Sequence, residues 1–196
     1  MLKIGLTGNI GSGKTMVAGI FSVLGIAVYH ADEESKKFLN DPQVKNTLLR
    51  YFGYSILTMS GEINKRSLAS LAFTDQDALL RLNSIMHPLV MKDFHEWTHD
   101  KLSQPYLIQE AAIIIESGLR LEFDKIIHVS CPRETAIKRV VKRDGIDVNS
   151  VLRRMQFQMA DDEKAAVSDF VIRNSGSEMV IPQVLAIHRR LSEGTA

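Results

Sequence analysis

The first fifteen residues constrain the fold of this chain more than any other stretch. Residues 2–7 form a short, mostly apolar run that is typical of a buried strand, and residues 8–15 read Gly-Asn-Ile-Gly-Ser-Gly-Lys-Thr. The second run matches the pattern G-x-x-x-x-G-K-[ST] of a phosphate-binding P-loop without departure. An apolar-rich helix is predicted from Met16 to Leu24, so strand, loop and helix follow in the required order. The sequence therefore favours a nucleotide site over a chance glycine-rich turn before a lysine.

Each part of this loop has a physical role in binding a phosphate. Its glycines permit positive φ angles and leave no Cβ atoms in the way. The backbone N–H groups can then face an anion at the positive end of the following helix. Lys14 is placed to meet the β- and γ-phosphates, and the hydroxyl of Thr15 to hold Mg²⁺. The predicted ATP-binding residues of this segment are Gly8, Asn9, Ile10, Gly11, Ser12, Gly13, Lys14, Thr15 and Met16.

Composition narrows the class of protein further. With 196 residues, 45% of them hydrophobic, the chain is long enough for one large domain, with or without an inserted piece. A net charge of +1 argues against a general nucleic-acid or membrane-surface binder. No apolar run approaches a membrane span, and the N-terminal run is too short for a signal peptide. Cys131 is the only cysteine, which fits a reducing compartment, so we expect a cytoplasmic protein.

Five apolar runs predict the sheet. They cover residues 2–7, 26–29, 106–110, 125–130 and 170–172, and helical patterns lie between them. The third and fourth runs are apolar without alternation, as in strands that are covered on both faces. Strands that alternate with helices predict an α/β fold with a doubly wound, five-stranded parallel sheet.

Residues 32–103 are too many for a single crossover between two parallel strands, and their signals are helical. The candidate helix caps in this stretch are Asp41, which precedes Pro42, and Asn64, Thr74 and Asp77. The pair His87-Pro88 predicts a break between two helices. We therefore expect a helical insertion that binds a substrate, or a plain helical elaboration without a ligand. The remaining core is predicted at about residues 1–31, 104–143 and 168–196.

Two carboxylates follow strands at the edge of the sheet where α/β proteins bind ligands. Asp32 comes after the second strand and could accept a proton from an attacking hydroxyl or orient it; the alternative is a helix cap. Glu110 ends the third strand, where a carboxylate can hold Mg²⁺ directly or through water, or can simply cap a loop. His87 precedes a proline, where a lone histidine is more often structural than a base.

Arginines gather after the fourth strand. Arg139 and Arg143 are four residues apart on one face of a predicted helix, and Arg154 and Gln158 repeat this spacing on the next helix, which Asp147 can cap. Guanidinium groups suit phosphoryl oxygens, so residues 144–167 are predicted to form a lid over the nucleotide. The alternative is a solvated basic face. Within this segment, Asp161 is a candidate cap for a short third helix.

Taken together, these features resemble the dephospho-coenzyme A kinase family, over nearly the whole chain. The resemblance rests on residues 6–14, Ala31-Asp32, His87-Pro88, residues 116–119, Gln158, Asp169, Val171-Ile172 and Asn174. It implies ATP-dependent phosphorylation of the ribose 3′-hydroxyl of dephospho-coenzyme A, the last step of coenzyme A synthesis. It also implies a nucleotide-kinase-like core, a helical coenzyme-binding domain and an arginine-bearing lid.

The motifs and the resemblance together assign roles to individual residues. The expected catalytic residues are Asp32, Lys14 and Arg139. The expected substrate-binding residues are Asp32, His87, Glu116, Arg154 and Gln158. Beyond the P-loop, Arg143 and Asn174 are expected to bind ATP, while Thr15 and Glu110 are expected to hold Mg²⁺. We expect ATP and dephospho-coenzyme A as partners, no nucleic acid and no membrane; the sequence does not predict the oligomeric state.

The chain departs from the usual family pattern in three places. His30-Ala31-Asp32 stands where Asp-Ala-Asp is usual, which removes one carboxylate near the metal. A glutamate, Glu110, replaces the usual aspartate, and Lys164 stands where arginine is common. Because Lys14 and Asp32 are retained, an active enzyme is still expected. The alternatives are a kinase for another small acceptor, a module that binds nucleotide without catalysis, and a nucleotide switch; the D-x-x-G and N-K-x-D motifs typical of GTPase switches are missing.

Overall fold

The computed structural model describes residues 1–73 and 75–193, and these form two compact units. The first unit contains Met1–His30 and the chain from Trp97 onward, and the second contains Ala31–Glu96. Thr74, one of the predicted helix caps, lies outside the described residues. Within the described ranges, no helix is both long and apolar enough to cross a membrane.

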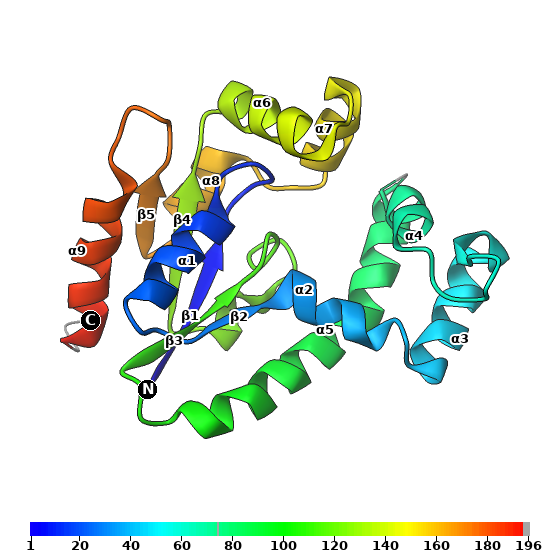
Figure 1. The fold of residues 1–196 in the computed structure, drawn as a ribbon, viewed down its shortest axis with the longest axis horizontal. Helices are drawn as coiled ribbons and strands as arrows, with labels where there is room; N and C mark the ends of the chain where they lie inside the picture. Colours follow the sequence, from blue (N-terminus) through cyan, green and yellow to red (C-terminus); the bar gives the residue numbers. More distant parts are fainter. Residues whose placement is uncertain (74, 194–196) are drawn as a thin grey trace. The chain divides into compact units, whose positions relative to one another are not determined.

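A five-stranded sheet forms the centre of the first unit (Figure 1). Its strands are β1 (Leu2–Thr7), β2 (Val28–His30), β3 (Tyr106–Glu110), β4 (Lys125–Ser130) and β5 (Phe170–Arg173). They lie in the order β2-β3-β1-β4-β5, and every neighbouring pair is parallel. The predicted α/β fold with a five-stranded parallel sheet is confirmed. Because all strands run the same way, their carboxyl ends meet at one edge, where the P-loop follows β1.

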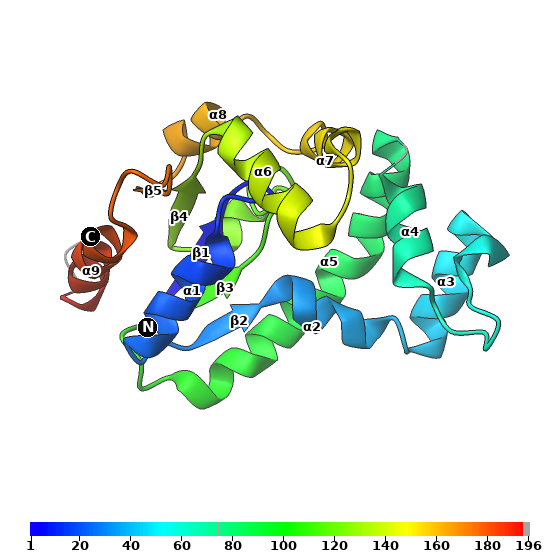
Figure 2. The same ribbon diagram turned by 45° about the horizontal axis from the view of Figure 1, so that its top comes forward.

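The first unit also contains helices. They are α1 (Lys14–Val23), α6 (Arg133–Asp144), α7 (Val148–Met155), α8 (Asp161–Ala166) and α9 (Val180–Ser192), with short 3₁₀ turns at His99–Lys101 (η2) and Leu119–Glu122 (η3). Helices α1 and α9 contact each other on one face of the sheet (Figures 1 and 2). Phe21 of α1, Ile4 of β1 and Val184 of α9 share one apolar core and are fully buried. This burial fixes the axis of α1, and with it the direction in which the P-loop faces.

The second unit is helical. It contains α2 (Ala31–Phe38), α3 (Pro42–Phe52), a 3₁₀ turn at Tyr54–Ile56 (η1), α4 (Lys65–Ala72) and most of α5 (Gln76–Thr98). The predicted caps Asp41 and Asn64 are confirmed, since each side chain accepts two backbone N–H bonds from the first turn of its helix. Leu48, Ile56 and Met86 belong to a separate apolar core within this unit.

The predicted helix break at His87-Pro88 is wrong. Helix α5 continues for 23 residues with Pro88 inside it. A proline in a helix interior removes one hydrogen bond and costs about 3 kcal/mol. Apolar side chains on both sides of the proline, among them Met86, Val90 and Phe94, are buried. Their burial offsets the cost, so tertiary packing overrides the local signal.

Two smaller predictions also need correction. Asp161 does not cap α8: the residue at the cap is Ala160, without a side-chain bond, and Asp161 is the first residue of the helix. Its carboxylate accepts hydrogen bonds from β4 instead. The cap predicted at Asp147 is confirmed, but its helix ends at Met155 rather than at Gln158.

Candidate active site

The P-loop links the end of β1 to the start of α1. Gly13 sits at the N-terminal cap of α1 with φ 95° and ψ 23°, a left-handed conformation. Gly8 and Gly11 also have positive φ, at 155° and 80°. These conformations strain any residue with a Cβ atom, so the glycines of the motif are required by the backbone itself. The loop therefore delivers backbone N–H groups to the N-terminal end of a helix, as an anion site requires.

Close packing around the loop excludes larger residues as well. A Cβ atom on Gly8 would approach the carbonyl oxygen of Val129 to 2.6 Å. One on Gly11 would collide with the backbone of Ala136 in α6, and one on Gly13 with the side-chain amide of Asn174. The loop is thus held between α6 and the segment after β5, and its shape is set before any ligand binds.

Two of the predicted ATP-binding and catalytic residues brace the loop from outside. Asn174, which is 6% exposed, donates from Nδ2 to the carbonyl of Ser12 over 2.7 Å. Arg139 donates from Nη2 to Oδ1 of Asn174 over 3.3 Å and from Nη1 to the same carbonyl over 3.5 Å. The guanidinium of Arg139 is therefore already positioned at the P-loop. A brace of this kind orients the loop and brings positive charge to it.

The hydroxyl of Ser12 has a different environment. Ser12 is 1% exposed, and its Oγ has no hydrogen-bond partner among the described residues. A buried hydroxyl without a partner costs free energy, so its presence calls for an explanation. A phosphate oxygen bound in the P-loop is the acceptor that the sequence predicts for this hydroxyl, and its binding there stays a prediction.

Replacing Arg139 by alanine is expected to lower kcat/KM about tenfold, because the brace and a positive charge beside the nucleotide are both lost. Steady-state kinetics with ATP as the varied substrate measures this change. Arg133→Ala is the matched control, since Arg133 lies exposed at the start of the same helix. Equal rates in the two variants would show that the brace does not matter to catalysis.

Arg143, predicted to bind ATP, and Arg154, predicted to bind the acceptor substrate, contact an acidic neighbour. Arg143 forms a bidentate pair with Asp144, with Nε–Oδ1 at 2.6 Å and Nη2–Oδ2 at 3.0 Å. This hydrogen bonding raises the pKa of Arg143 and lowers the pKa of Asp144. Nη1 of Arg154 lies 3.8 Å from Oδ2 of the same Asp144. Both arginines point to one carboxylate at the end of α6, and their roles toward ATP and the acceptor stay predictions.

Glu110 and Thr15, the predicted metal-binding pair, are brought together. Glu110 is 7% exposed, and its Oε1 accepts from the hydroxyl of Thr15 over 3.3 Å. Oε2 of the same carboxylate lies 2.7 Å from Nδ1 of His30. No cluster of three or more metal-ligating side chains occurs in the part of the chain that the structure describes. The donors at hand, one carboxylate and one hydroxyl, fit Mg²⁺, which takes few protein ligands and completes its shell with water and phosphate oxygens.

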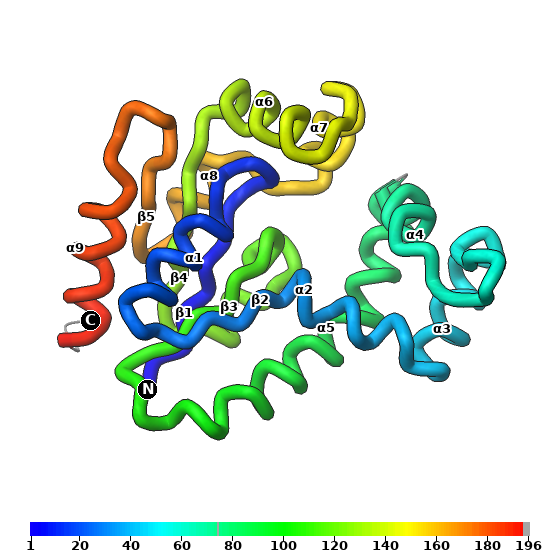
Figure 3. Tube along the Cα trace, viewed as in Figure 1, coloured from blue at the N-terminus to red at the C-terminus, as the bar shows by residue number. Residues whose placement is uncertain are grey.

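The segment before α8 contacts the first residues of the P-loop (Figure 3). Oε1 of Gln158 accepts from the backbone N–H of Ile10 over 2.9 Å, and Nδ2 of Asn9 donates to the carbonyl of Met159 over 3.2 Å. Oε1 of Glu116 in turn accepts from the N–H of Met159 over 3.1 Å. Two predicted substrate-binding residues, Gln158 and Glu116, therefore contact the protein itself, and Gln158 uses one of the P-loop amides.

Lys164 of α8 is a site residue that the motifs missed. Its side chain is fully buried, with Nζ 2.6 Å from Oε1 of Glu116 and 2.9 Å from the carbonyl oxygen of Ala112. Burial lowers the pKa of Lys164, the carboxylate of Glu116 opposes that shift, and the charge of Lys14 adds to it. The positive charges of Lys164 and of the P-loop residue Lys14 therefore repel each other. A lysine in a short charged helix is normally predicted to be exposed to solvent. The sequence feature that marked Lys164 was its replacement of the arginine that is common in the family at this position.

A second missed group joins α8 to β4. Asp161 accepts from Oγ of Ser130 over 2.5 Å, and its Oδ1 lies 3.0 Å from Nε2 of the fully buried His128. Burial acts to raise the pKa of Asp161, but the hydrogen bonds from His128 and Ser130 outweigh it, so the pKa is lowered. These bonds fix the start of α8, and with it the place of Lys164.

Two predicted residues belong to the helical unit. Asp32 is the second residue of α2, two positions after the end of β2, in the first helical turn, where a carboxylate is favoured. It does not occupy the cap position. His87 lies within α5, and burial lowers its pKa. Catalysis by Asp32 and substrate binding by His87 stay predictions.

Comparison with known proteins identifies the family of this chain. The sequence model that describes dephospho-CoA kinase matches residues 2–179. The chain belongs to the dephospho-CoA kinase family. It is 38% identical to the dephospho-CoA kinase of Bacteroides fragilis (strain YCH46) over 95% of this chain and 91% of that protein. It is 36% identical to that of Aquifex aeolicus over 98% of each chain.

Solved structures agree with this fold. TT1252 from Thermus thermophilus is 30% identical to this chain and superposes with a TM-score of 0.82, over 100% of this chain and 98% of that one. Dephospho-CoA kinase from Campylobacter jejuni, at 23% identity, shares the fold with a TM-score of 0.69, over 99% of this chain and 98% of that one. As a dephospho-CoA kinase the chain is a P-loop kinase and an enzyme of the final step of coenzyme A synthesis.

Proposed function

We propose that the chain transfers the γ-phosphoryl group of ATP to the ribose 3′-hydroxyl of dephospho-coenzyme A, with Mg²⁺ as the metal ion. The observation that carries this proposal is the braced P-loop, with its buried Ser12 hydroxyl and the Thr15–Glu110 pair, in a chain of the dephospho-CoA kinase family. The single cysteine of the sequence, Cys131, is free and buried, as is usual in a reducing compartment, which supports a cytoplasmic enzyme.

The P-loop residues bind and orient the triphosphate. Backbone N–H groups between Gly8 and Thr15 meet the phosphate oxygens, and the hydroxyl of Ser12 donates one more bond. Lys14 neutralises charge that develops as the phosphoryl group leaves, and Arg139 adds positive charge beside the loop. Because Asn174 and α6 hold the loop before binding, little reorganisation is needed when charge develops.

Glu110 and Thr15 are the residues that would hold Mg²⁺. When bound, the ion neutralises charge on the β- and γ-phosphates. Glu110 is nearly buried at the end of β3, so its carboxylate has a fixed place from which to meet a cation or its water shell. The hydroxyl of Thr15 and the carboxylate of Glu110, which lie 3.3 Å apart, are close enough that both would hold the same ion.

The helical unit, residues 31–96, is proposed to bind the acceptor, with His87 among its contacts. Asp32 is proposed to accept the proton of the ribose 3′-hydroxyl, or to orient that hydroxyl toward phosphorus. Residues 144–167 are proposed to close over bound ATP as a lid, with Arg154 meeting the acceptor. Gln158 must then release the N–H of Ile10, so that this amide becomes available to phosphate.

Replacing Asp32 by asparagine is expected to lower kcat about a hundredfold, with a smaller change in ATP binding, because the amide cannot take up a proton. Rates at saturating acceptor and the Kd for ATP should be measured together. Asp41→Asn is a matched control, since asparagine caps a helix as well as aspartate does. A loss in kcat of less than about threefold for Asp32→Asn would leave this residue only its place in the first helical turn.

The acceptor is tested by ADP release from ATP with a panel of hydroxyl compounds. The panel should contain dephospho-coenzyme A, adenosine and nucleoside monophosphates, with the product of each reaction identified by mass. We expect turnover with dephospho-coenzyme A to exceed that with each of the others. If another acceptor reacts faster, the P-loop roles stand and the acceptor assignment does not.

A further inference from the structure

His30 and Glu110 are the last residues of two neighbouring parallel strands. In the register of β2 with β3 the two residues are direct partners, His30 opposite Glu110. Their side chains meet, with Nδ1 of His30 2.7 Å from Oε2 of Glu110. The contact is therefore built by the sheet itself rather than by a mobile loop.

The carboxylate of Glu110 is held at both oxygens. Oε2 meets His30, and Oε1 accepts from the hydroxyl of Thr15. The side chain of Glu110 is 9% exposed and that of His30 37%. His30 lies within ion-pair distance of this carboxylate. Without His30, Oε2 would be an acceptor with little access to water, and the carboxylate would be free to turn away from the P-loop.

We propose that His30 is a positioning residue for the metal site. It donates Nδ1–H to Oε2 of Glu110 and thereby keeps Oε1 facing the hydroxyl of Thr15. This inference rests on the proposed function, in which Glu110 and Thr15 hold Mg²⁺. Hydrogen bonds from a second layer of residues commonly fix the orientation of carboxylates that ligate metals, and their loss costs roughly 10–100-fold in metal affinity or activity.

The chemistry of the pair indicates which substitutions test it. An ionised carboxylate only accepts hydrogen bonds, so the proton must sit on Nδ1 of the imidazole. His30→Phe keeps a planar ring but has no donor. His30→Asn keeps an N–H donor close to the place of Nδ1, so it should preserve the contact with Glu110.

The test measures how Mg²⁺ changes the binding of ADP, which needs no acceptor and no turnover. Calorimetric titration gives the Kd of ADP in EDTA and over a series of Mg²⁺ concentrations. For His30→Phe we expect the Mg²⁺ concentration at half effect to rise about tenfold, with the Kd in EDTA unchanged. His30→Asn should lie closer to the wild type than to His30→Phe. Turnover over the same Mg²⁺ series should show the loss of His30→Phe recovering at high Mg²⁺.

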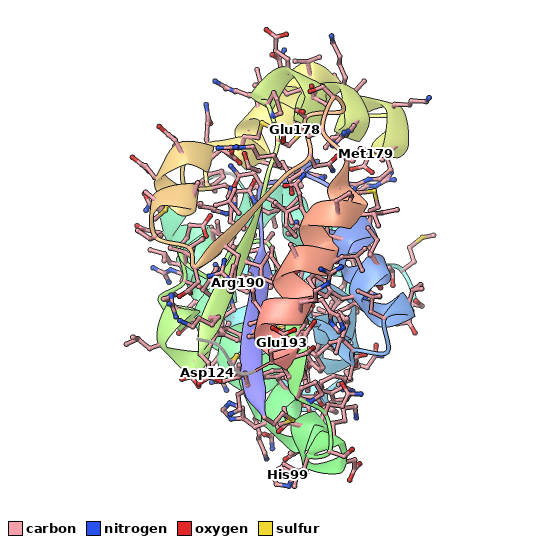
Figure 4. The ribbon with its side chains drawn as sticks, turned by 90° about the vertical axis from the view of Figure 1, so that its left-hand side faces the viewer. His99, Asp124, Glu178, Met179, Arg190 and Glu193 are labelled. Atoms are coloured by element: carbon pink, nitrogen blue, oxygen red, sulfur yellow. The ribbon has the colours of Figure 1, made fainter. Side chains whose placement is uncertain are left out.

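Two further variants separate the possible outcomes. His99→Phe is the control for loss of a histidine. Figure 4 shows His99 at the opposite end of this unit from Glu178 and Met179, which follow the carboxyl end of β5, and Glu110 lies at the carboxyl end of the parallel strand β3. Glu110→Gln tests the metal role itself. If Glu110→Gln weakens the response to Mg²⁺ and His30→Phe does not, the positioning role is overturned and the metal site stands. If neither variant changes the response, Glu110 is not a metal ligand and both statements fall, whichever acceptor the enzyme uses. Melting temperatures identify any variant that does not fold.

Discussion

Replacing Lys14 by methionine is expected to lower kcat about a thousandfold and to leave the chain folded. The lysine follows the αL residue Gly13 at the first turn of α1, and its charge is proposed to meet phosphate oxygens as they become more negative in the transition state. Methionine has a similar length but no charge, so the lost interaction is electrostatic. The loop keeps its shape, because the Asn174 and Arg139 contacts to Ser12 do not involve Lys14.

The electrostatic environment of Lys14 sharpens this prediction. Its charge acts to lower the pKa of the buried Lys164, so the substitution removes one repulsion in the folded state. The melting temperature of Lys14→Met should therefore lie no further below that of the wild type than the melting temperature of a typical surface variant does. Lys138→Met, an exposed position on α6, is the control for the loss of a lysine. Turnover near the wild-type rate in folded Lys14→Met would refute the assignment of this loop as the catalytic phosphate site.

The features that the sequence predicts well are those whose cause is local. The P-loop motif needs positive φ at fixed positions, and only glycine supplies it without strain, so the pattern is visible in the letters. Asp41 and Asn64 cap their helices by bonds to residues two and three positions ahead, so these too can be predicted. Five apolar runs between helices were enough to predict the parallel sheet.

The missed features depend on contacts between distant residues. His30 meets Glu110 only because β2 pairs with β3 in one particular register, and no local pattern encodes that register. Asp161 does not cap its helix because its carboxylate accepts hydrogen bonds from Ser130 and His128 of β4 instead. Pro88 stays inside α5 because buried neighbours on both sides hold the helix together. In each case the free energy of tertiary contacts exceeds the local preference.

Lys164 shows how such contacts join the parts of the site. It binds Glu116, Glu116 binds the N–H of Met159, and the carbonyl of Met159 accepts from Asn9 of the P-loop. Oε2 of Glu116 and Oδ1 of Asn9 are buried without hydrogen-bond partners among the described residues. Buried polar atoms without hydrogen-bond partners destabilise the folded protein, and a ligand or a water molecule that bonds to them removes this free-energy cost. A series of contacts therefore connects the buried Lys164, through Glu116 and Met159, to Asn9 of the P-loop.

Replacing Lys164 by methionine is expected to lower the free energy of unfolding by about 3 kcal/mol. The substitution removes the cation that pairs with Glu116 and leaves a carboxylate that is 16% exposed without this charge partner. Urea titration at neutral pH, followed by circular dichroism, measures the change. In a protein of this size the same loss corresponds to a shift of about 2–4 °C in Tm per kcal/mol.

A double substitution shows whether the cost comes from the unpaired charge. In Lys164→Met with Glu116→Leu both charges are gone, so the loss of stability should be smaller than the sum of the two single losses. Lys36→Met is the matched control, because Lys36 forms an exposed pair with Glu33 on α2, and its loss should cost less than about 1 kcal/mol. If Lys164→Met costs no more than Lys36→Met, the buried pair does not hold α8 in place. If Lys164→Met costs about 3 kcal/mol and the double variant recovers part of this loss, the role of Lys164 is to neutralise the charge of Glu116. The KM for ATP should then rise more in the single variant than in the double variant.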